Sequence, residues 1–150
     1  MQERNGEIKA VVLRNRRDMC AIRYAGKMSY KDFLSFCKLL REHKECRFYD
    51  NALRAPVDDL EEAFKSAHSP LDFIGRLRSA GVCPCEAARR LVKNANVVIG
   101  SYNYIFDHET RKAFLGNVKL SLRDIMVIID EAHNLPANLS ETYSVSLSII

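Results

Sequence analysis

The sequence predicts an α/β fold in which a helical segment interrupts a parallel sheet. Two short apolar runs, at 96–100 and 124–130, have the character of strands buried on both faces, and a helical pattern separates them, as in a βαβ crossover. Between residues 16 and 93 the apolar residues recur at helical spacing, and all five cysteines lie there. A sheet of these few strands would have unpaired edges, and we therefore expect the chain to be a fragment of a larger protein.

Residues 8–13 have the composition of a first strand, which we expect to join the same sheet. Ser29 and Asp32 have the spacing of a helix N-terminal cap, and the apolar residues that follow place Cys37 on the apolar face of a helix. Proline, serine and glycine residues mark the ends of the other helices, which we expect at 56–67, 71–77, 84–93, 101–106 and 109–115.

The composition is that of one globular domain: 150 residues, 47% hydrophobic and 28% charged. This excludes a disordered or collagen-like chain. No apolar run approaches the roughly 20 residues of a membrane-spanning helix, and no signal-peptide core follows the polar N-terminus. We therefore expect an intracellular, cytoplasmic protein with no membrane contact.

Charge is uneven along the chain. Residues 1–54 carry 13 Lys and Arg against 7 Asp and Glu, a net charge of +6, whereas residues 55–100 are neutral and residues 101–150 carry −2. A basic first third suits a polyanionic partner, and it is equally compatible with a solvated basic surface.

The cysteines are Cys20, Cys37, Cys46, Cys83 and Cys85. Disulfides are not expected in an intracellular protein, so this number favours a metal or cluster site over five small buried hydrophobic side chains. The spacing alone does not decide between iron–sulfur and zinc. The lack of any Cys-x-x-Cys pair argues against a zinc ribbon.

Asp130, Glu131, Ala132 and His133 follow the second apolar run directly, at the carboxyl end where open α/β sheets bind ligands. One carboxylate there can hold nucleotide-bound Mg²⁺ through water, and the other can activate the attacking water in phosphoryl transfer. This pattern is the Walker B motif, or DEAH box, of a helicase-type ATPase, and the alternative is a polar turn that ends a strand. A zinc-protease site is excluded because no His-Glu-x-x-His occurs.

A complete ATP site also needs a Walker A loop, Gly-x-x-x-x-Gly-Lys-Ser/Thr. The only Gly-Lys pair is Gly26-Lys27, which is followed by Met28, and Ala21 occupies the position of the first glycine. The sequence therefore contains half an ATP site, and the chain alone should not turn over ATP.

Several segments together are similar to one family: Arg16–Cys20, Cys46–Tyr49, 81–89, 95–107 and 127–134. In this order they resemble the middle of an XPD-type, archaeal-style iron–sulfur DNA helicase of superfamily two. The resemblance implies a RecA-like parallel-sheet motor domain with a mostly helical four-cysteine iron–sulfur insert. The implied division is motor domain at 1–15, insert at 16–93, motor domain with the DEAH box at 94–135, and an exit strand toward the next insert at 136–150.

The resemblance also implies a 4Fe-4S cluster bound by Cys20, Cys37, Cys46 and Cys83, with ATP and Mg²⁺ in the full-length parent. Cys85 departs from the family, in which the residue after the proline is often aromatic and near the DNA path. This leaves Cys83 and Cys85 as rival ligands. The flanking Gly81, Pro84, Ala88 and Arg89 favour Cys83, with Cys85 a buried thiol.

Further site residues follow from the same resemblance. Asp130 would hold Mg²⁺, Glu131 would activate water, and His133 would link the ATP site to the DNA side. Basic residues interleaved with aromatic rings are typical of a single-strand path. The nucleic-acid contacts expected are Arg16, Arg23, Tyr24, Arg89, Ser101 and Asn103.

These nucleic-acid contacts have ordinary alternatives. Each arginine is also compatible with a plain surface position. Ser101 is as compatible with a helix N-cap as with a phosphate contact. For Tyr102 and Tyr104, packing inside the protein is favoured.

The implied activity of the parent is ATP-dependent 5′ to 3′ DNA unwinding in nucleotide excision repair, with the cluster domain beside the strand-separation pore. Its partners would be single-stranded and fork DNA and the remaining motor domains of the same protein. The rival class is a non-catalytic metal- or cluster-binding module that contacts nucleic acid.

Overall fold

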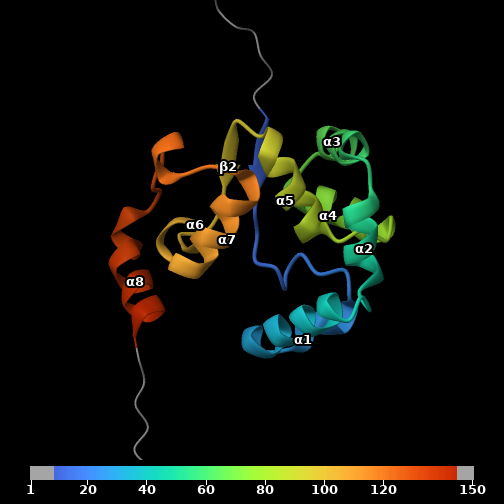
Figure 1. Cartoon of the computed structure of the whole chain (residues 1–150), viewed down its shortest axis with the longest axis horizontal. Helices are drawn as coiled ribbons and strands as arrows, with labels where there is room; N and C mark the ends of the chain where they lie inside the picture. Colours follow the sequence, from blue (N-terminus) through green and yellow to red (C-terminus); the bar gives the residue numbers. More distant parts are fainter. Residues whose placement is uncertain (1–8, 145–150) are drawn as a thin grey trace, which may run out of the picture. The chain divides into compact units, whose positions relative to one another are not determined.

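Figure 1 shows the computed structural model, which describes residues 9–144. The chain divides into two compact units that meet in the sequence between Ile99 and Gly100, a few residues beyond the end of the expected insert at 93. The first unit holds all five cysteines, and the second holds the Asp130–His133 motif. In the described residues, no helix is long and apolar enough to cross a membrane.

The sheet of the first unit consists of two parallel strands, β1 (Ala10–Val12) and β2 (Val97–Ile99). Ala10 pairs with Val97 and Val12 with Ile99. The Leu13 amide extends the ladder by donating to the Ile99 carbonyl at 2.8 Å. Within the described residues, the strand expected at 8–13 is present as Ala10–Val12 and joins a parallel sheet, as expected, and the structure adds that its neighbour is the run at 96–100.

Helices fill the chain between the two strands, as the apolar spacing predicts. They are a 3₁₀ turn, η1 (Arg23–Lys27), then α1 (Tyr30–Glu42), α2 (Arg47–Arg54), α3 (Val57–Lys65), α4 (Pro70–Ser79), α5 (Pro84–Leu91) and a second 3₁₀ turn, η2 (Val92–Asn94). The expected cap at Ser29 is present, because its Oγ accepts from the Asp32 amide at 3.2 Å. The sequence did not predict α2, which begins directly after Cys46.

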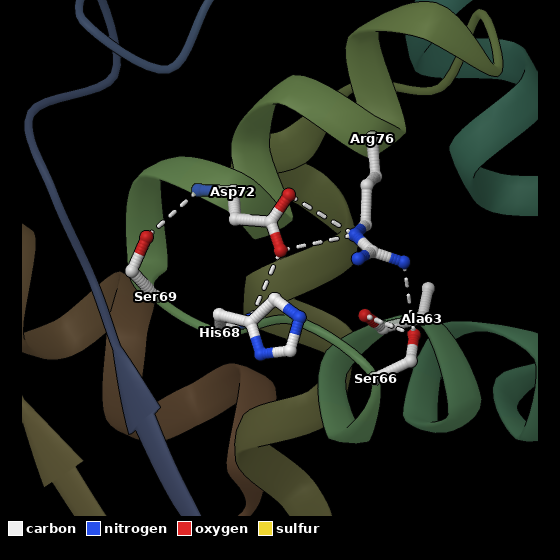
Figure 2. Close-up of polar contacts among 6 residues, drawn as sticks. All are labelled: Ala63, Ser66, His68, Ser69, Asp72 and Arg76. Atoms are coloured by element: carbon white, nitrogen blue, oxygen red, sulfur yellow. Dashed lines mark hydrogen bonds and ion pairs between the residues drawn. The ribbon is translucent and has the colours of Figure 1, made fainter.

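The start of α4 is fixed by a local polar network (Figure 2). Ser69 Oγ accepts from the Asp72 amide at 3.1 Å, and Asp72 in turn accepts from the His68 amide at 3.0 Å. Both Asp72 oxygens lie 3.1 Å from Arg76 Nε, one turn further along the helix. Arg76 lowers the pKa of Asp72 most, and the His68 amide adds to this effect. The network therefore ties the α3–α4 loop to the first turn of α4.

The core of the first unit forms around α5, which packs against α2, α3, α4 and β1. Its buried face carries Ala87 and Ala88, whose small side chains let the neighbouring helices approach closely. Phe33 and Met19 form the other buried cluster, at 0% and 1% exposure. This second cluster lies beside the cysteines.

The second unit contains α6 (Asn103–Phe106), α7 (His108–Val118), the 3₁₀ turns η3 (Leu122–Asp124) and η4 (Ala132–Asn134), and α8 (Leu135–Tyr143). Asp107 caps α7 by accepting from the Thr110 amide at 2.8 Å. Helices α6 and α7 pack together through Tyr104 and Phe114, whose ring centroids lie 5.1 Å apart.

One expectation for the second unit is wrong. The run at 124–130 forms no strand in the described part of the chain, and Met126 and Ile128 are 91% and 88% exposed. A central parallel strand needs a hydrogen-bonded neighbour on each side, which the described residues do not supply to this run.

The exit strand expected within 136–150 stays a prediction, although α8 occupies the first part of this segment. Pro136 lies in the first turn of α8, where proline is tolerated. Asn138 and Thr142 continue α8 with side-chain bonds to carbonyls one turn earlier. Residues 145–150 lie outside the described residues.

Candidate functional site

The four cysteines expected to act as ligands come from four separate elements and line a single pocket. Cys20 lies in the turn before η1, Cys37 in α1, and Cys46 and Cys83 immediately precede α2 and α5. All four thiols are partly exposed. The remaining walls are mainly apolar and aromatic: Ala21, Ile22, Phe33, Phe36, Leu40, Phe48 and Tyr49, with Arg16 and Arg41.

Two hydrogen bonds join the loop that carries Cys83 to helix α2, which begins directly after Cys46. The Cys83 amide donates to the Phe48 carbonyl at 2.9 Å, and Asn51 Nδ2 donates to the Gly81 carbonyl at 3.0 Å. Gly81 has a φ of +72°, a conformation that glycine adopts without strain and that ends α4. The expected stop at Gly81 is thus present, and it delivers Cys83 to the pocket.

The thiols of Cys20 and Cys83 are in an environment that disfavours their charged form. Burial raises the pKa of Cys83 to about 12, against which a backbone hydrogen bond at Glu86 and the charge of Arg16 act. Burial also raises the pKa of Cys20. Both side chains are therefore protonated thiols at neutral pH, and binding of a metal or cluster would release their protons.

The donor set fits a thiolate-bound group but not a preformed single-ion site. No Asp, Glu or His side chain lines the pocket. Among the described residues, no three His, Cys, Asp or Glu side chains lie close enough together to hold one metal ion. Four cysteine thiolates serve as ligands of structural zinc and of iron–sulfur clusters, so the donor set fits either group.

Cys85 lies apart from this set. It is 4% exposed in the first turn of α5 and does not line the pocket. Burial raises the pKa of its thiol, which the charges of Arg16 and Arg89 oppose. The structure therefore groups Cys83, and not Cys85, with the other three cysteines.

The expected nucleic-acid contacts of the first unit differ in exposure. Arg16 is partly buried, and its Nη1 lies 3.9 Å from the Cys37 sulfur, so its guanidinium points toward the thiols. Arg23 and Tyr24 are exposed in η1, although the Tyr24 ring also packs on Phe36 at 5.7 Å. Arg89 is partly exposed in the last turn of α5.

Two further cations near the pocket escaped the sequence reasoning. The Arg41 guanidinium lies over the Tyr49 ring at 5.6 Å, and that of Arg47 lies over the Phe48 ring at 5.1 Å. Arg41 Nε also donates to the Cys37 carbonyl at 3.2 Å. The four-residue spacing between Cys37 and Arg41 on one helix was the available signal.

The acidic motif of the second unit forms a compact turn. Glu131 has a left-handed conformation, with φ +49°, and its amide donates to Asp130 Oδ1 at 2.9 Å. His133 Nδ1 lies 3.2 Å from Glu131 Oε2, and the two side chains are 73% and 65% exposed. The hydroxyl of Tyr102 donates to the carbonyls of Asp130 and Glu131, at 2.6 and 3.0 Å. The expectation that Tyr102 only packs inside the protein is therefore incomplete.

The turn before α6 leaves two other expected residues open to solvent. Ser101 and Asn103 are exposed, and Ser101 does not cap α6 with its side chain. A Cβ at Gly100 would meet the Tyr104 ring at 2.9 Å, so this position needs glycine because the aromatic ring covers it. Tyr104 packs on Phe114, as expected.

Comparison with known proteins gives a family. The sequence model of the DEAD_2 family matches residues 1–149 of this chain. "ATP-dependent DNA helicase CHL1" of Saccharomyces cerevisiae is 30% identical over 152 residues, which is 97% of this chain and 17% of the relative. The protein of that name from Eremothecium gossypii is 26% identical over 144 residues, 95% of this chain and 18% of the relative.

"Regulator of telomere elongation helicase 1" of Homo sapiens is 27% identical over 149 residues, 93% of this chain and 11% of the relative. The chain thus spans less than a fifth of the length of these three relatives.

Proposed function

Because the chain belongs to the DEAD_2 family, we propose that it is part of an ATP-dependent DNA helicase, in which residues 16–93 hold a 4Fe-4S cluster. The convergence of four cysteines from four elements on one pocket carries the proposal. The names of the relatives, which are ATP-dependent or telomere-elongation helicases, support the DNA-unwinding part. An XPD-like, archaeal-style parent remains the finer proposal, supported by the motif order.

The proposed cluster ligands are Cys20, Cys37, Cys46 and Cys83. An iron–sulfur cluster bound by four thiolates is a compact crosslink between segments that are distant in the sequence. Here these segments are the loop after β1, helix α1 and the starts of α2 and α5. The cluster's role would be structural: it fixes the helices that form a wedge at the strand-separation pore.

In the ATP site of the parent, Mg²⁺ would neutralise charge on the nucleotide phosphates. Asp130 would hold that ion through water. Glu131 would orient the attacking water and accept its proton, since its carboxylate is exposed and its conformation is fixed by the turn. His133, which pairs with Glu131 at 3.2 Å, would link this carboxylate to the DNA-binding side. The Walker A half would come from sequence outside this chain, together with the remaining motor domains.

The proposed DNA is a single strand and its fork, with movement 5′ to 3′ and a role in nucleotide excision repair in a prokaryotic cytoplasm. The net charge of +6 over residues 1–54 supports a polyanion path through the first unit. Backbone contacts are proposed for Ser101 and Asn103, and charge or stacking contacts for Arg16, Arg23, Tyr24 and Arg89.

The test uses the full-length protein with Glu131→Gln. We expect ATP and Mg²⁺ binding to persist and DNA-stimulated hydrolysis to fall by at least about 100-fold, as for loss of a general base. Glu109→Gln is the matched control, because Glu109 forms a similar exposed pair with His108 at 3.0 Å outside the motif. Fork substrates with a single 5′ or 3′ tail then report direction. Hydrolysis that survives Glu131→Gln would refute the role of Glu131, and a wild-type protein without DNA-stimulated hydrolysis would favour a non-catalytic binding module.

A further inference from the structure

The hydroxyl of Tyr102 touches two successive carbonyls of the acidic motif. It lies 2.6 Å from the Asp130 oxygen and 3.0 Å from the Glu131 oxygen. Consecutive carbonyls point to the same side only where the residue between them has a helical conformation, right- or left-handed. Glu131 has the left-handed one, with φ +49° and ψ +43°. The position of the hydroxyl therefore matches this particular conformation of Glu131.

A left-handed conformation is unfavourable for a residue with a side chain, and glutamate gains no local compensation of the kind available to asparagine. Such a residue persists only where its surroundings hold it in place. The described residues supply three such restraints on the motif's main chain: the Tyr102 hydroxyl, the bond from the Glu131 amide to Asp130 Oδ1, and the bond from the Asn134 amide to the Glu131 carbonyl at 2.9 Å. Of these three, only the Tyr102 hydroxyl comes from a segment distant in the sequence.

Tyr102 is itself anchored in the turn that follows β2. Its carbonyl accepts from the amides of Ile105 and Phe106, at 3.0 and 2.8 Å, so its backbone forms the start of α6. Its neighbours Ser101 and Asn103 are the exposed residues proposed to contact the DNA backbone. One side chain thus connects the proposed DNA-contacting turn to the proposed water-activating residue.

We infer that Tyr102 is a positioning residue, whose hydroxyl holds Glu131 in its left-handed conformation and transmits the state of the DNA-contacting turn to ATP hydrolysis. This inference rests on the proposed function, because it assigns Tyr102 a role in the same reaction. Loss of the hydroxyl frees Glu131 to relax to a right-handed or extended conformation, which redirects its carboxylate. ATP binding, which Glu131 does not supply, is unaffected.

The experiment is Tyr102→Phe in the full-length protein, which removes only the hydroxyl. We expect kcat for DNA-stimulated hydrolysis to fall about tenfold or more, with KM for ATP and single-strand affinity within about twofold of wild type. Tyr143→Phe is the matched control, since the Tyr143 hydroxyl donates to the Phe106 carbonyl, away from the motif. Replacing Tyr102 with p-aminophenylalanine, which restores a donor at the same place, should recover most of the lost kcat.

The outcomes separate the two proposals. If Tyr102→Phe keeps the kcat of the Tyr143→Phe control while Glu131→Gln abolishes hydrolysis, the positioning role is refuted and the proposed function stands. A fall in kcat that accompanies lower thermal stability, and that p-aminophenylalanine does not recover, shows a structural role only and also refutes the inference. If Glu131→Gln hydrolyses ATP normally, the proposed role of Glu131 fails and the inference fails with it, whereas a wild-type protein without DNA-stimulated hydrolysis refutes the proposed function itself.

Discussion

Cys83 and Cys85 lie two residues apart at the start of α5, and they provide the sharpest test of the proposed cluster. Cys83 lines the pocket with the other three cysteines, whereas Cys85 is 4% exposed and does not line it. Cys83→Ser should therefore lose most of the iron, as should the equivalent change at Cys20, Cys37 or Cys46. Cys85→Ser should keep the wild-type content of about four iron atoms per chain.

The stability cost of the control follows from its burial. A serine hydroxyl at position 85 would replace a buried thiol, and a buried hydroxyl without a partner costs about 1–3 kcal/mol. Cys85→Ala avoids that hydroxyl, so it should retain iron with a smaller loss of stability. Cys83→Ser removes a ligand instead. The loss of stability in Cys83→Ser should then exceed that in Cys85→Ser, because binding of the cluster is coupled to folding of the helices that the cluster joins.

The assay is iron and acid-labile sulfide per chain in protein purified without oxygen, with the visible spectrum as a second readout. A brown protein with a broad band at the blue end of the spectrum indicates iron–sulfur, whereas zinc leaves it colourless. Iron loss in Cys85→Ser and Cys85→Ala, together with iron retention in Cys83→Ser, would refute the assignment of Cys83. Full iron in all five single Cys→Ser variants would refute the pocket as the cluster site.

Three further changes test other parts of the structure. Arg89→Ala should lower the salt dependence of single-strand binding by about one unit of slope and leave the iron content unchanged. Arg16→Ala should also lower the iron content, because the Arg16 guanidinium lies 3.9 Å from the Cys37 sulfur. Equal iron content in the two variants would contradict this prediction. Asp72→Asn should lower the free energy of unfolding at neutral pH, and chemical unfolding should show the difference from wild type disappearing as the pH falls below 3.8. The folded state lowers the pKa of Asp72 below its ordinary value of 3.8, so the carboxylate stabilises the fold above this pH and loses that effect as it becomes protonated. The isolated chain should show no ATP hydrolysis above buffer in a phosphate-release assay, and robust turnover would refute the half-site interpretation.

Local signals explain what the sequence could predict. The cap at Ser29, the proline at the start of α4 and the left-handed Gly81 act within a few residues, so their effects are readable from spacing. That β1 joins a sheet was also predictable, because it is an apolar run next to a helical segment, whereas its neighbour β2 was not specified. Helix α2 was missed although its apolar residues recur at helical spacing, because Arg47–Arg54 is only eight residues long and half of them are charged or polar.

The run at 124–130 failed for a different physical reason. Its composition is that of a central strand, but strand formation depends on hydrogen-bonding neighbours rather than on composition. With Met126 and Ile128 almost fully exposed, the run has the surface of a buried segment without the elements that would cover it. The described residues place no strand beside this run, which is why the same residues predict a strand and do not form one here.

The candidate site shows the same division between local and distant determinants. The turn at Asp130 and Glu131 forms although the run before it is unpaired, because Tyr102 and the Asp130 side chain bind its main chain. The cysteine pocket likewise forms from helix starts and loop bonds within residues 16–93. Contacts within the chain thus specify the shape of each motif, whereas the sheet and the second half of the proposed ATP site would come from the rest of the proposed larger protein. Sequence reasoning missed Tyr102 because a hydroxyl that acts on a motif 28 residues away leaves no periodic signal.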